Sequence, residues 1–139
     1  MAITTTQQIQ DSRYRNITKY VCDAAANTNV SLLDVSALSG FVAVRTSLVT
    51  IAKITWTSSG PSGGLDILWD ATTNKLAFIC EGTGGTYGYS PGQPAISNDA
   101  GGGVTGDVLI TNASATFTLV IEYHKQITAG GTGWTVSQQ

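Results

Sequence analysis

The chain carries few residues that could perform acid–base chemistry. His124 is its sole histidine, and histidine is the side chain most often used to transfer protons near neutral pH. It follows directly on an alternating apolar segment that ends at Tyr123. We therefore interpret His124 as a surface residue at the end of a strand, and we expect no enzymatic activity.

The carboxylates also lack a catalytic spacing. Asp66 and Asp70 would lie on one face of a strand about 13 Å apart, which is too far for the carboxylate pair of a glycosidase. The segment from Asp70 to Asn74 has some similarity to a calcium-binding loop. It lacks the further acidic ligands and the closing glutamate of such a loop. We predict a polar turn here that caps its own backbone.

Two further patterns are typical of cofactor or metal sites. Residues 101–106 (GGGVTG) satisfy Gly-x-Gly-x-x-Gly, but a dinucleotide site needs a strand before this pattern and a helix after it. Cys22, Cys80 and His124 lie on three separate segments, without the paired cysteine spacing of a zinc site. We predict no cofactor and no metal. Cys22 and Cys80 are interpreted as buried reduced thiols, and a disulfide would require their Cα atoms to lie within about 7 Å.

The composition excludes some classes of partner. Hydrophobic residues make up 42% of the 139 residues and charged residues 12%, with a net charge of −2. A nucleic-acid binder needs a basic surface that displaces counterions from phosphates, so we expect no DNA or RNA partner. The first residues lack a basic and apolar leader, and no later segment approaches the roughly 18 apolar residues of a membrane span. We expect a protein that does not attach to a membrane.

Apolar and polar residues alternate with a period of two along most of the chain, which predicts strands and almost no helix. The pattern is typical of an all-β protein, a two-sheet antiparallel β-sandwich or jelly roll. The predicted strands span residues 13–22, 30–35, 41–44, 48–57, 65–70, 75–80, 107–111 and 116–123. The last four form two hairpins, the second turning at residues 112–114. In the first hairpin the residues expected to share a core face are Leu65, Ile67, Trp69, Leu76, Phe78 and Cys80.

Around the β-sandwich domain, at residues 13–125, we expect three extended or irregular parts. A Thr- and Gln-rich N-terminal arm covers residues 1–12, a long Gly-rich loop covers 81–106, and a C-terminal tail covers 126–139. Long loops usually exist because they contact something. The candidate residues of a protein interface are Ile9, Arg13, Arg15, Tyr87, Tyr89 and Trp134.

Three segments resemble parts of a known class of protein: residues 9–15 (IQDSRYR), 68–74 (LWDATTN) and 102–108 (GGVTGDV). They are similar to segments of small virion structural proteins from the head and tail gene modules of tailed bacteriophages. The resemblance implies a structural component of the virion, made in the host cytoplasm. Within this class we favour a capsid decoration (cement) protein that binds the outer surface of the major capsid protein shell and stabilises it.

A decoration protein needs a stiff β core, low charge and extended parts that add contact area across neighbouring shell subunits. Shell proteins usually form closed rings on symmetry axes, so we expect a homo-oligomer, with a trimer as the first expectation. A tail, neck or baseplate component would share the same composition and fold. A carbohydrate-binding module or host-attachment domain is the alternative of another class, with exposed aromatic side chains as its sugar platform.

Overall fold

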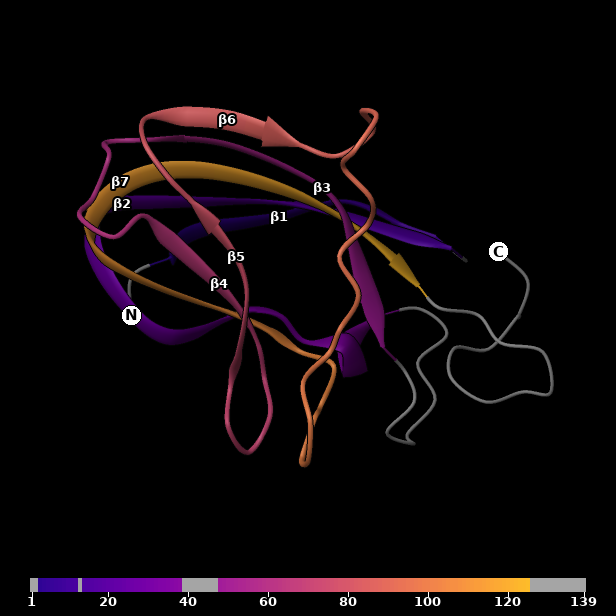
Figure 1. Ribbon diagram of the computed structural model, residues 1–139. Helices are drawn as coiled ribbons and strands as arrows, with labels where there is room; N and C mark the ends of the chain where they lie inside the picture. The colour runs from indigo at the N-terminus through magenta and orange to yellow at the C-terminus, as the bar shows by residue number, and fades with distance from the viewer. Residues whose placement is uncertain (1–2, 13, 39–47, 126–139) are drawn as a thin grey trace, which may run out of the picture.

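The computed structural model describes residues 3–12, 14–38 and 48–125. Within these ranges the chain is all-β, with one antiparallel sheet of seven strands and one short 3-10 helix (Figure 1). No helix in the described ranges is long and apolar enough to cross a membrane. The elements are β1 (Ile3–Asp11), β2 (Arg15–Leu33), η1 (Val35–Ala37), β3 (Val49–Ser58), β4 (Leu65–Trp69), β5 (Lys75–Cys80), β6 (Gly84–Tyr87) and β7 (Val108–Lys125).

The two long strands, β2 and β7, hold the sheet together. They pair from Arg15 opposite His124 to Leu33 opposite Val108. One part of the sheet has the order β1-β2-β7-β3-β6, whereas the first residues of β7 pair with β4, which in turn pairs with β5. In Figure 1 both long ribbons curve at one side of the molecule. Because buried residues of both parts belong to one apolar cluster, the sheet folds over a single core.

The core is apolar apart from a few buried polar groups. Tyr20 and Tyr123 share a hydrogen bond between their hydroxyl oxygens, which lie 2.9 Å apart. Burial raises the pKa of both phenols, so each remains protonated. The other large side chains that are almost fully buried are Trp69, Phe117, Ile51, Ile54, Leu65, Ile67, Ile110, Leu119 and Ile121.

The bend of β7 lies where the second hairpin turn is predicted. Residues 112–114 form no turn, because β7 continues through them, and the prediction of two strands joined by a hairpin loop is wrong here. The buried positions change from even to odd numbers: Asn112 ends one set, and Ala115 begins the next, with Ala113 and Ser114 exposed between them. This change of face marks a β-bulge, an extra residue in one strand of a pair. A β-bulge bends the strand and increases its twist.

A matching irregularity bends β2. Its register with β7 shifts three times between Cys22 and Val30. Ala24 and Asn29 adopt positive φ angles of 52° and 49°, in the left-handed region that alanine seldom occupies. Each shift interrupts the ladder of backbone hydrogen bonds, so buried backbone groups at the bend need other partners.

Two buried asparagines supply such partners, and we call Asn27 and Asn112 the asparagine corner. Asn27 Nδ2 donates to Asn112 Oδ1 at 2.7 Å, and Asn112 Nδ2 donates to the carbonyl oxygen of Ala25 at 3.2 Å. Beside the corner, Cys22 is buried without a disulfide, as is Cys80 in β5. This confirms the interpretation of both cysteines as buried free thiols.

Two predicted elements are confirmed: residues 48–57 correspond to β3, and the first hairpin corresponds to β4 and β5. One predicted core residue of this hairpin is wrong. Leu76 is 46% exposed, because the register shifts after Ile67 and places Leu76 opposite Leu68 on the outer side. The predicted core residues that are fully buried are Leu65, Ile67, Trp69 and Cys80, and Phe78 is partly buried.

The predicted N-terminal arm is wrong for residues 3–11. They form β1, an edge strand that pairs antiparallel with β2, and Ile3 at its start is buried in the core. Threonine and isoleucine favour strands, although the polar composition indicated an arm. Of the predicted strand at residues 30–35, the first part belongs to β2 and the last residue begins η1. The strand predicted at residues 41–44 and the tail at 126–139 lie outside the described residues.

The Gly-rich segment predicted as a loop, residues 81–106, is attached to the sheet. It contains β6, which pairs with β3, and Ile96 exchanges two backbone hydrogen bonds with Ile51 at 2.9 and 2.8 Å. Gly88 has a φ of 113°, and a Cβ there would lie 2.1 Å from a backbone oxygen of β3. Only glycine fits this close approach, which brings the next residue, Tyr89, onto the sheet.

Candidate binding surface

A group of polar side chains lies on the outer face of the sheet, near the end of β7. Leu119, Ile121 and Tyr123 of β7 point into the core, so Glu122 and His124 between and after them point to the opposite face. The register places β2 on one side of this pair, with Arg15 opposite His124. Strand β3 lies on the other side. Three neighbouring strands therefore position the charges.

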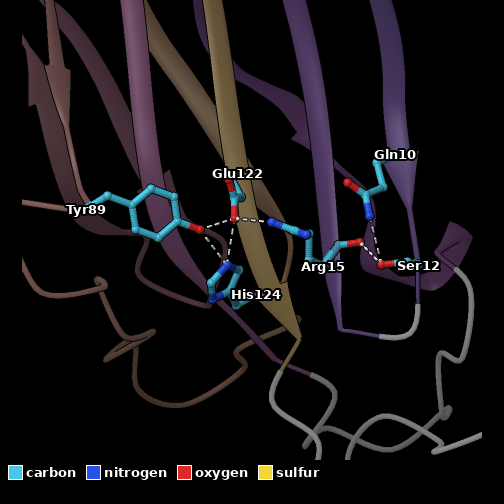
Figure 2. A network of polar contacts seen from close by, with 6 residues as sticks. All are labelled: Gln10, Ser12, Arg15, Tyr89, Glu122 and His124. Atoms are coloured by element: carbon cyan, nitrogen blue, oxygen red, sulfur yellow. Dashed lines mark hydrogen bonds and ion pairs between the residues drawn. The ribbon is translucent and has the colours of Figure 1, made fainter.

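Glu122 is the centre of this group (Figure 2). Its Oε2 atom accepts hydrogen bonds from His124 Nε2 at 2.8 Å and from Arg15 Nη1 at 3.3 Å, and also from the hydroxyl of Tyr89. The Tyr89 hydroxyl also lies 3.1 Å from His124 Nε2, and Lys53 Nζ lies 5.8 Å from the centre of the Tyr89 ring. We call Arg15, Tyr89, Glu122 and His124 the outer-face cluster.

The environment fixes the charge on Glu122. Burial of this side chain, which is 10% exposed, would raise its pKa, but hydrogen bonds from Tyr89, His124 and Arg15 outweigh burial and lower the pKa. The pKa of Tyr89 is raised by burial and by the Glu122 carboxylate. Glu122 is therefore an anion surrounded by donors, and Tyr89 is a neutral phenol. These directions favour a binding role over proton transfer at neutral pH.

A shallow hollow of about 370 Å³ adjoins the cluster, and its lining residues are Tyr14, Arg15, Tyr89, His124 and Lys125. The side chains of Tyr14 and Tyr89 flank it and are prominent on the surface, since these residues are 56% and 60% exposed. Exposed tyrosines beside an arginine are the side chains that protein interfaces concentrate.

A buried ion pair holds the base of this hollow. Lys125 Nζ lies 2.7 Å from Asp11 Oδ1 and 2.7 Å from the carbonyl oxygen of Ser12, and the Lys125 side chain is fully buried. The turn between β1 and β2 is closed by hydrogen bonds of Ser12, whose Oγ donates to the carbonyl oxygen of Arg15 at 3.3 Å and accepts from Gln10 Nε2 at 3.3 Å (Figure 2). The position of Arg15 is thus set by several independent contacts.

No protein-family model and no curated protein matches this chain.

Of the interface residues predicted from the sequence, the structure brings together Arg15 and Tyr89, which share Glu122 as acceptor. Ile9 is 55% exposed on β1, outside the cluster. Tyr87 is turned elsewhere, because its hydroxyl donates to the carbonyl oxygen of Pro94 at 2.8 Å and its ring packs on a neighbouring phenylalanine. Arg13 and Trp134 lie outside the described residues.

Sequence reasoning missed Glu122 and Tyr14 and gave His124 no role beyond that of a surface residue at a strand end. His124 is indeed partly exposed near the end of β7. The available signal was the position of Glu122 between the core residues Ile121 and Tyr123, which places it on the polar face of the strand. Its partners could not be read from the sequence, because Arg15 and Glu122 are 107 residues apart.

The other chemical patterns have structural explanations. Asn74 Oδ1 accepts from the backbone N–H of Ala71 at 3.0 Å, which confirms the predicted turn that caps its own backbone. Thr105 Oγ1 donates to Asp70 Oδ2 at 2.8 Å and ties this turn to the glycine-rich segment. Within residues 3–12, 14–38 and 48–125, no group of three or more His, Cys, Asp or Glu side chains could hold a metal ion.

A Gly-x-Ser-x-Gly pattern, typical of hydrolase nucleophiles, occurs at residues 60–64. Here it connects strands β3 and β4, whereas the nucleophile elbow of hydrolases joins a strand to a helix. His124 lies opposite Thr50, near the start of β3, whereas the Gly-x-Ser-x-Gly pattern follows Ser58, the last residue of β3. Eight residues of strand separate these two points by roughly 26 Å, so His124 does not serve Ser62 as a base.

Replacing Glu122 with glutamine should lower the free energy of unfolding at pH 7 by about 1–3 kcal/mol, because charge-assisted hydrogen bonds are replaced by neutral ones. The pKa of Glu122 is lowered in the folded protein, so its stabilisation is present above the ordinary glutamate pKa and is lost as the pH falls through the folded value. The difference between the two proteins should therefore shrink on acidification, as measured by urea denaturation from pH 7 to 3.

Comparison of the two proteins at each pH removes the contribution of the other carboxylates. Burial raises the pKa of Asp66 and Asp107, and their effect on stability has the opposite sign and is common to both chains. A difference in unfolding free energy that stayed constant with pH would contradict the role assigned to the Glu122 charge.

Proposed function

We propose that this chain is a virion structural protein of a tailed bacteriophage, a capsid decoration (cement) protein that binds the outer surface of the major capsid protein shell. The proposal draws on the resemblance of three segments to small phage head and tail proteins. Two of these segments, residues 68–74 and 102–108, lie side by side: the backbone N–H of Thr72 donates to the carbonyl oxygen of Gly102 at 3.1 Å. The segments therefore form one local unit.

The observation that carries a binding role is the hollow beside the outer-face cluster. Tyr14 and Tyr89 flank it, and Arg15 is held in place by Glu122 while its side chain remains 46% exposed. A fixed guanidinium has donors available for a carboxylate of a partner, and little side-chain entropy remains to be lost on binding. An acidic patch of the shell is the complementary surface.

We propose that the bent sheet acts as a two-layer β-sandwich, which is stiff enough to bridge shell subunits, and that the chain assembles as a closed homo-oligomer on the virion surface. A stiff sheet suits a protein whose role is to stabilise a shell. A tail, neck or baseplate location is the alternative within the same class.

Replacing Tyr14 or Arg15 with alanine should weaken binding to purified capsid shells about tenfold each, which corresponds to about 1.4 kcal/mol, because aromatic and arginine residues dominate interface energies. Binding is measured by sedimentation of the labelled chain with shells assembled from the major capsid protein alone. The control is Thr28→Ala, an exposed position at the bend of β2, which should bind as the unaltered chain does.

Electron microscopy of intact particles then locates the chain. Density for the fold on the outer capsid, with the hollow facing a shell subunit, would support the proposal. Density only in the tail or neck would replace it with the tail-component alternative. Binding to an oligosaccharide array that is lost in Tyr14→Ala, without binding to shells, would favour a carbohydrate-binding module instead.

A further inference from the structure

Three side chains of the outer-face cluster bring a nitrogen atom and two oxygen atoms to one point on the sheet (Figure 2). Glu122 and His124 are two residues apart on β7, so their side chains share a face. His124 Nε2 lies 2.8 Å from Glu122 Oε2 and 3.1 Å from the hydroxyl oxygen of Tyr89, which also contacts Glu122 Oε2. Each of the three atoms therefore contacts the other two, and together they form a small triangle.

The size of this triangle suits a transition-metal ion. Zinc binds nitrogen and oxygen ligands at about 2.0–2.2 Å, so two ligands at angles of about 90–110° lie about 2.8–3.5 Å apart. The separations of 2.8 and 3.1 Å from His124 Nε2 fall in this range. The described residues contain no group of three or more His, Cys, Asp or Glu side chains that could hold a metal. Here the third donor is the phenol of Tyr89, beside an imidazole and a carboxylate.

The backbone around Tyr89 holds this third donor in place. Tyr89 has a φ of 61°, in the left-handed region that large side chains seldom adopt. Gly88 before it lies against the backbone of β3, and Ile96 after it exchanges backbone hydrogen bonds with Ile51. Residues in such strained conformations concentrate at ligand-binding sites. The segment thus keeps the phenol next to the two donors of β7.

We propose that Tyr89, Glu122 and His124 bind one divalent transition-metal ion, for which Zn²⁺ is the test ion. On binding, the hydroxyl proton of Tyr89 leaves to solvent, and His124 coordinates through Nε2 as a neutral imidazole whose proton is on Nδ1. The carboxylate and the phenolate together balance the charge of the ion. A neutral centre of this kind is compatible with the neighbouring cations Arg15 and Lys53.

Arg15 and the adjoining hollow complete the surroundings of the ion. Arg15 Nη1 lies 3.3 Å from Glu122 Oε2, and a hydrogen bond to a ligating carboxylate orients it toward the metal. Tyr89 and His124 line the hollow of about 370 Å³, so the metal can enter from solvent. Zinc sites with three protein ligands keep the fourth position for water or a further ligand. The hollow provides room for a water molecule at that position.

This inference goes beyond the proposed capsid role, because metal binding is measured on the isolated chain. Shell binding measured in the presence of a metal chelator tests the capsid proposal alone. Failure of one proposal is therefore distinguishable from failure of the other.

Isothermal titration calorimetry of the chain without an affinity tag, using zinc chloride, should show one Zn²⁺ bound per chain. His124 is the sole histidine, and Cys22 and Cys80 are buried, so few other strong ligands compete. His124→Gln and Tyr89→Phe should each raise the dissociation constant at least tenfold, since loss of even an outer hydrogen-bonding partner costs about 10–100-fold in affinity.

Tyr87→Phe is the matched control for Tyr89→Phe. Tyr87 lies on the same segment, but its hydroxyl donates to the carbonyl oxygen of Pro94, so this variant should bind Zn²⁺ as tightly as the unaltered chain. An ultraviolet difference spectrum then tests Tyr89 as a ligand. Zn²⁺ should produce the signal of an ionised tyrosine in the unaltered chain and in Tyr87→Phe, and no such signal in Tyr89→Phe. A purely structural role of the Tyr89 hydroxyl would not produce this signal.

His124 and Tyr89 are both substantially exposed, so the two variants should keep the fold, which circular dichroism checks. The inference would be overturned by an unaltered chain that binds no Zn²⁺, or by a His124→Gln variant that binds it equally tightly. Zinc binding without the signal of an ionised tyrosine would also overturn the proposed site, because the phenolate is one of its three ligands.

Discussion

Replacing Lys125 with methionine should lower the free energy of unfolding by about 3–5 kcal/mol, the cost of removing one partner of a buried ion pair. The Lys125 side chain is fully buried and that of Asp11 is 11% exposed, with 2.7 Å between Nζ and Oδ1. Methionine fills a similar volume but removes the Lys125 cation from the Asp11 carboxylate and the Lys125 donor from the Ser12 carbonyl. Urea denaturation followed by circular dichroism at pH 7 measures the change.

Two further variants test the cause of this loss. Lys125→Met combined with Asp11→Asn should recover part of the stability, since the charge that Lys125 balances is then removed as well. The matched control is Lys75→Met, because Lys75 pairs with Asp99 at 3.4 Å but both side chains are more than half exposed. Breaking that surface pair should cost less than about 1 kcal/mol. Equal losses from Lys125→Met and Lys75→Met would contradict the importance of the buried pair.

Replacing Asn112 with alanine should lower the free energy of unfolding by about 2–4 kcal/mol, because a buried group that loses its hydrogen-bond partner costs about 1–3 kcal/mol. Two such groups are affected: Asn27 Nδ2 loses its oxygen acceptor and keeps only the Cys22 sulfur at 3.8 Å, and the carbonyl oxygen of Ala25 loses a donor. Ser114→Ala, at an exposed position of the same bend, should change the stability by no more than about 0.5 kcal/mol. Chemical denaturation of both variants measures the two effects.

A double-mutant cycle isolates the link between the two asparagines. The effect of Asn27→Ala together with Asn112→Ala should be smaller than the sum of the single effects, because each single variant already breaks the shared hydrogen bond. Strict additivity would mean that the corner acts only through each residue's separate packing.

The parts of the fold that could be predicted are those in which one local pattern decides the outcome. The alternation around Trp69 and the polar turn after it define the β4–β5 hairpin, and the long alternation that includes Ile54 defines β3. The prediction fails at residues 112–114, where a polar stretch was interpreted as a loop. In the structure this stretch is a bulged strand, and Asn112 is buried because Asn27 faces it.

In the candidate site, too, some residues could be predicted from the sequence and others could not. Arg15 and Tyr89 could be selected from the sequence, because an arginine within a predicted strand and an aromatic residue in a glycine-rich loop stand out from their neighbours. Glu122 could not be selected, since a single glutamate in an alternating strand normally faces solvent without a partner. Its role depends on the register of β7 against both β2 and β3, and strand register over such separations is set by tertiary packing.

The path of β2 and β7 through both parts of the sheet sets the order of events during synthesis. Strand β2 is finished at Leu33, but its long partner is complete only at Lys125. At about 5–20 residues per second, the roughly 90 intervening residues take about 5–18 s to translate. During that interval the edge of β2 that pairs with β7 has no partner strand. Nascent chains of this protein are therefore expected to bind ribosome-associated chaperones, and the described sheet is completed only after β7 has left the ribosome.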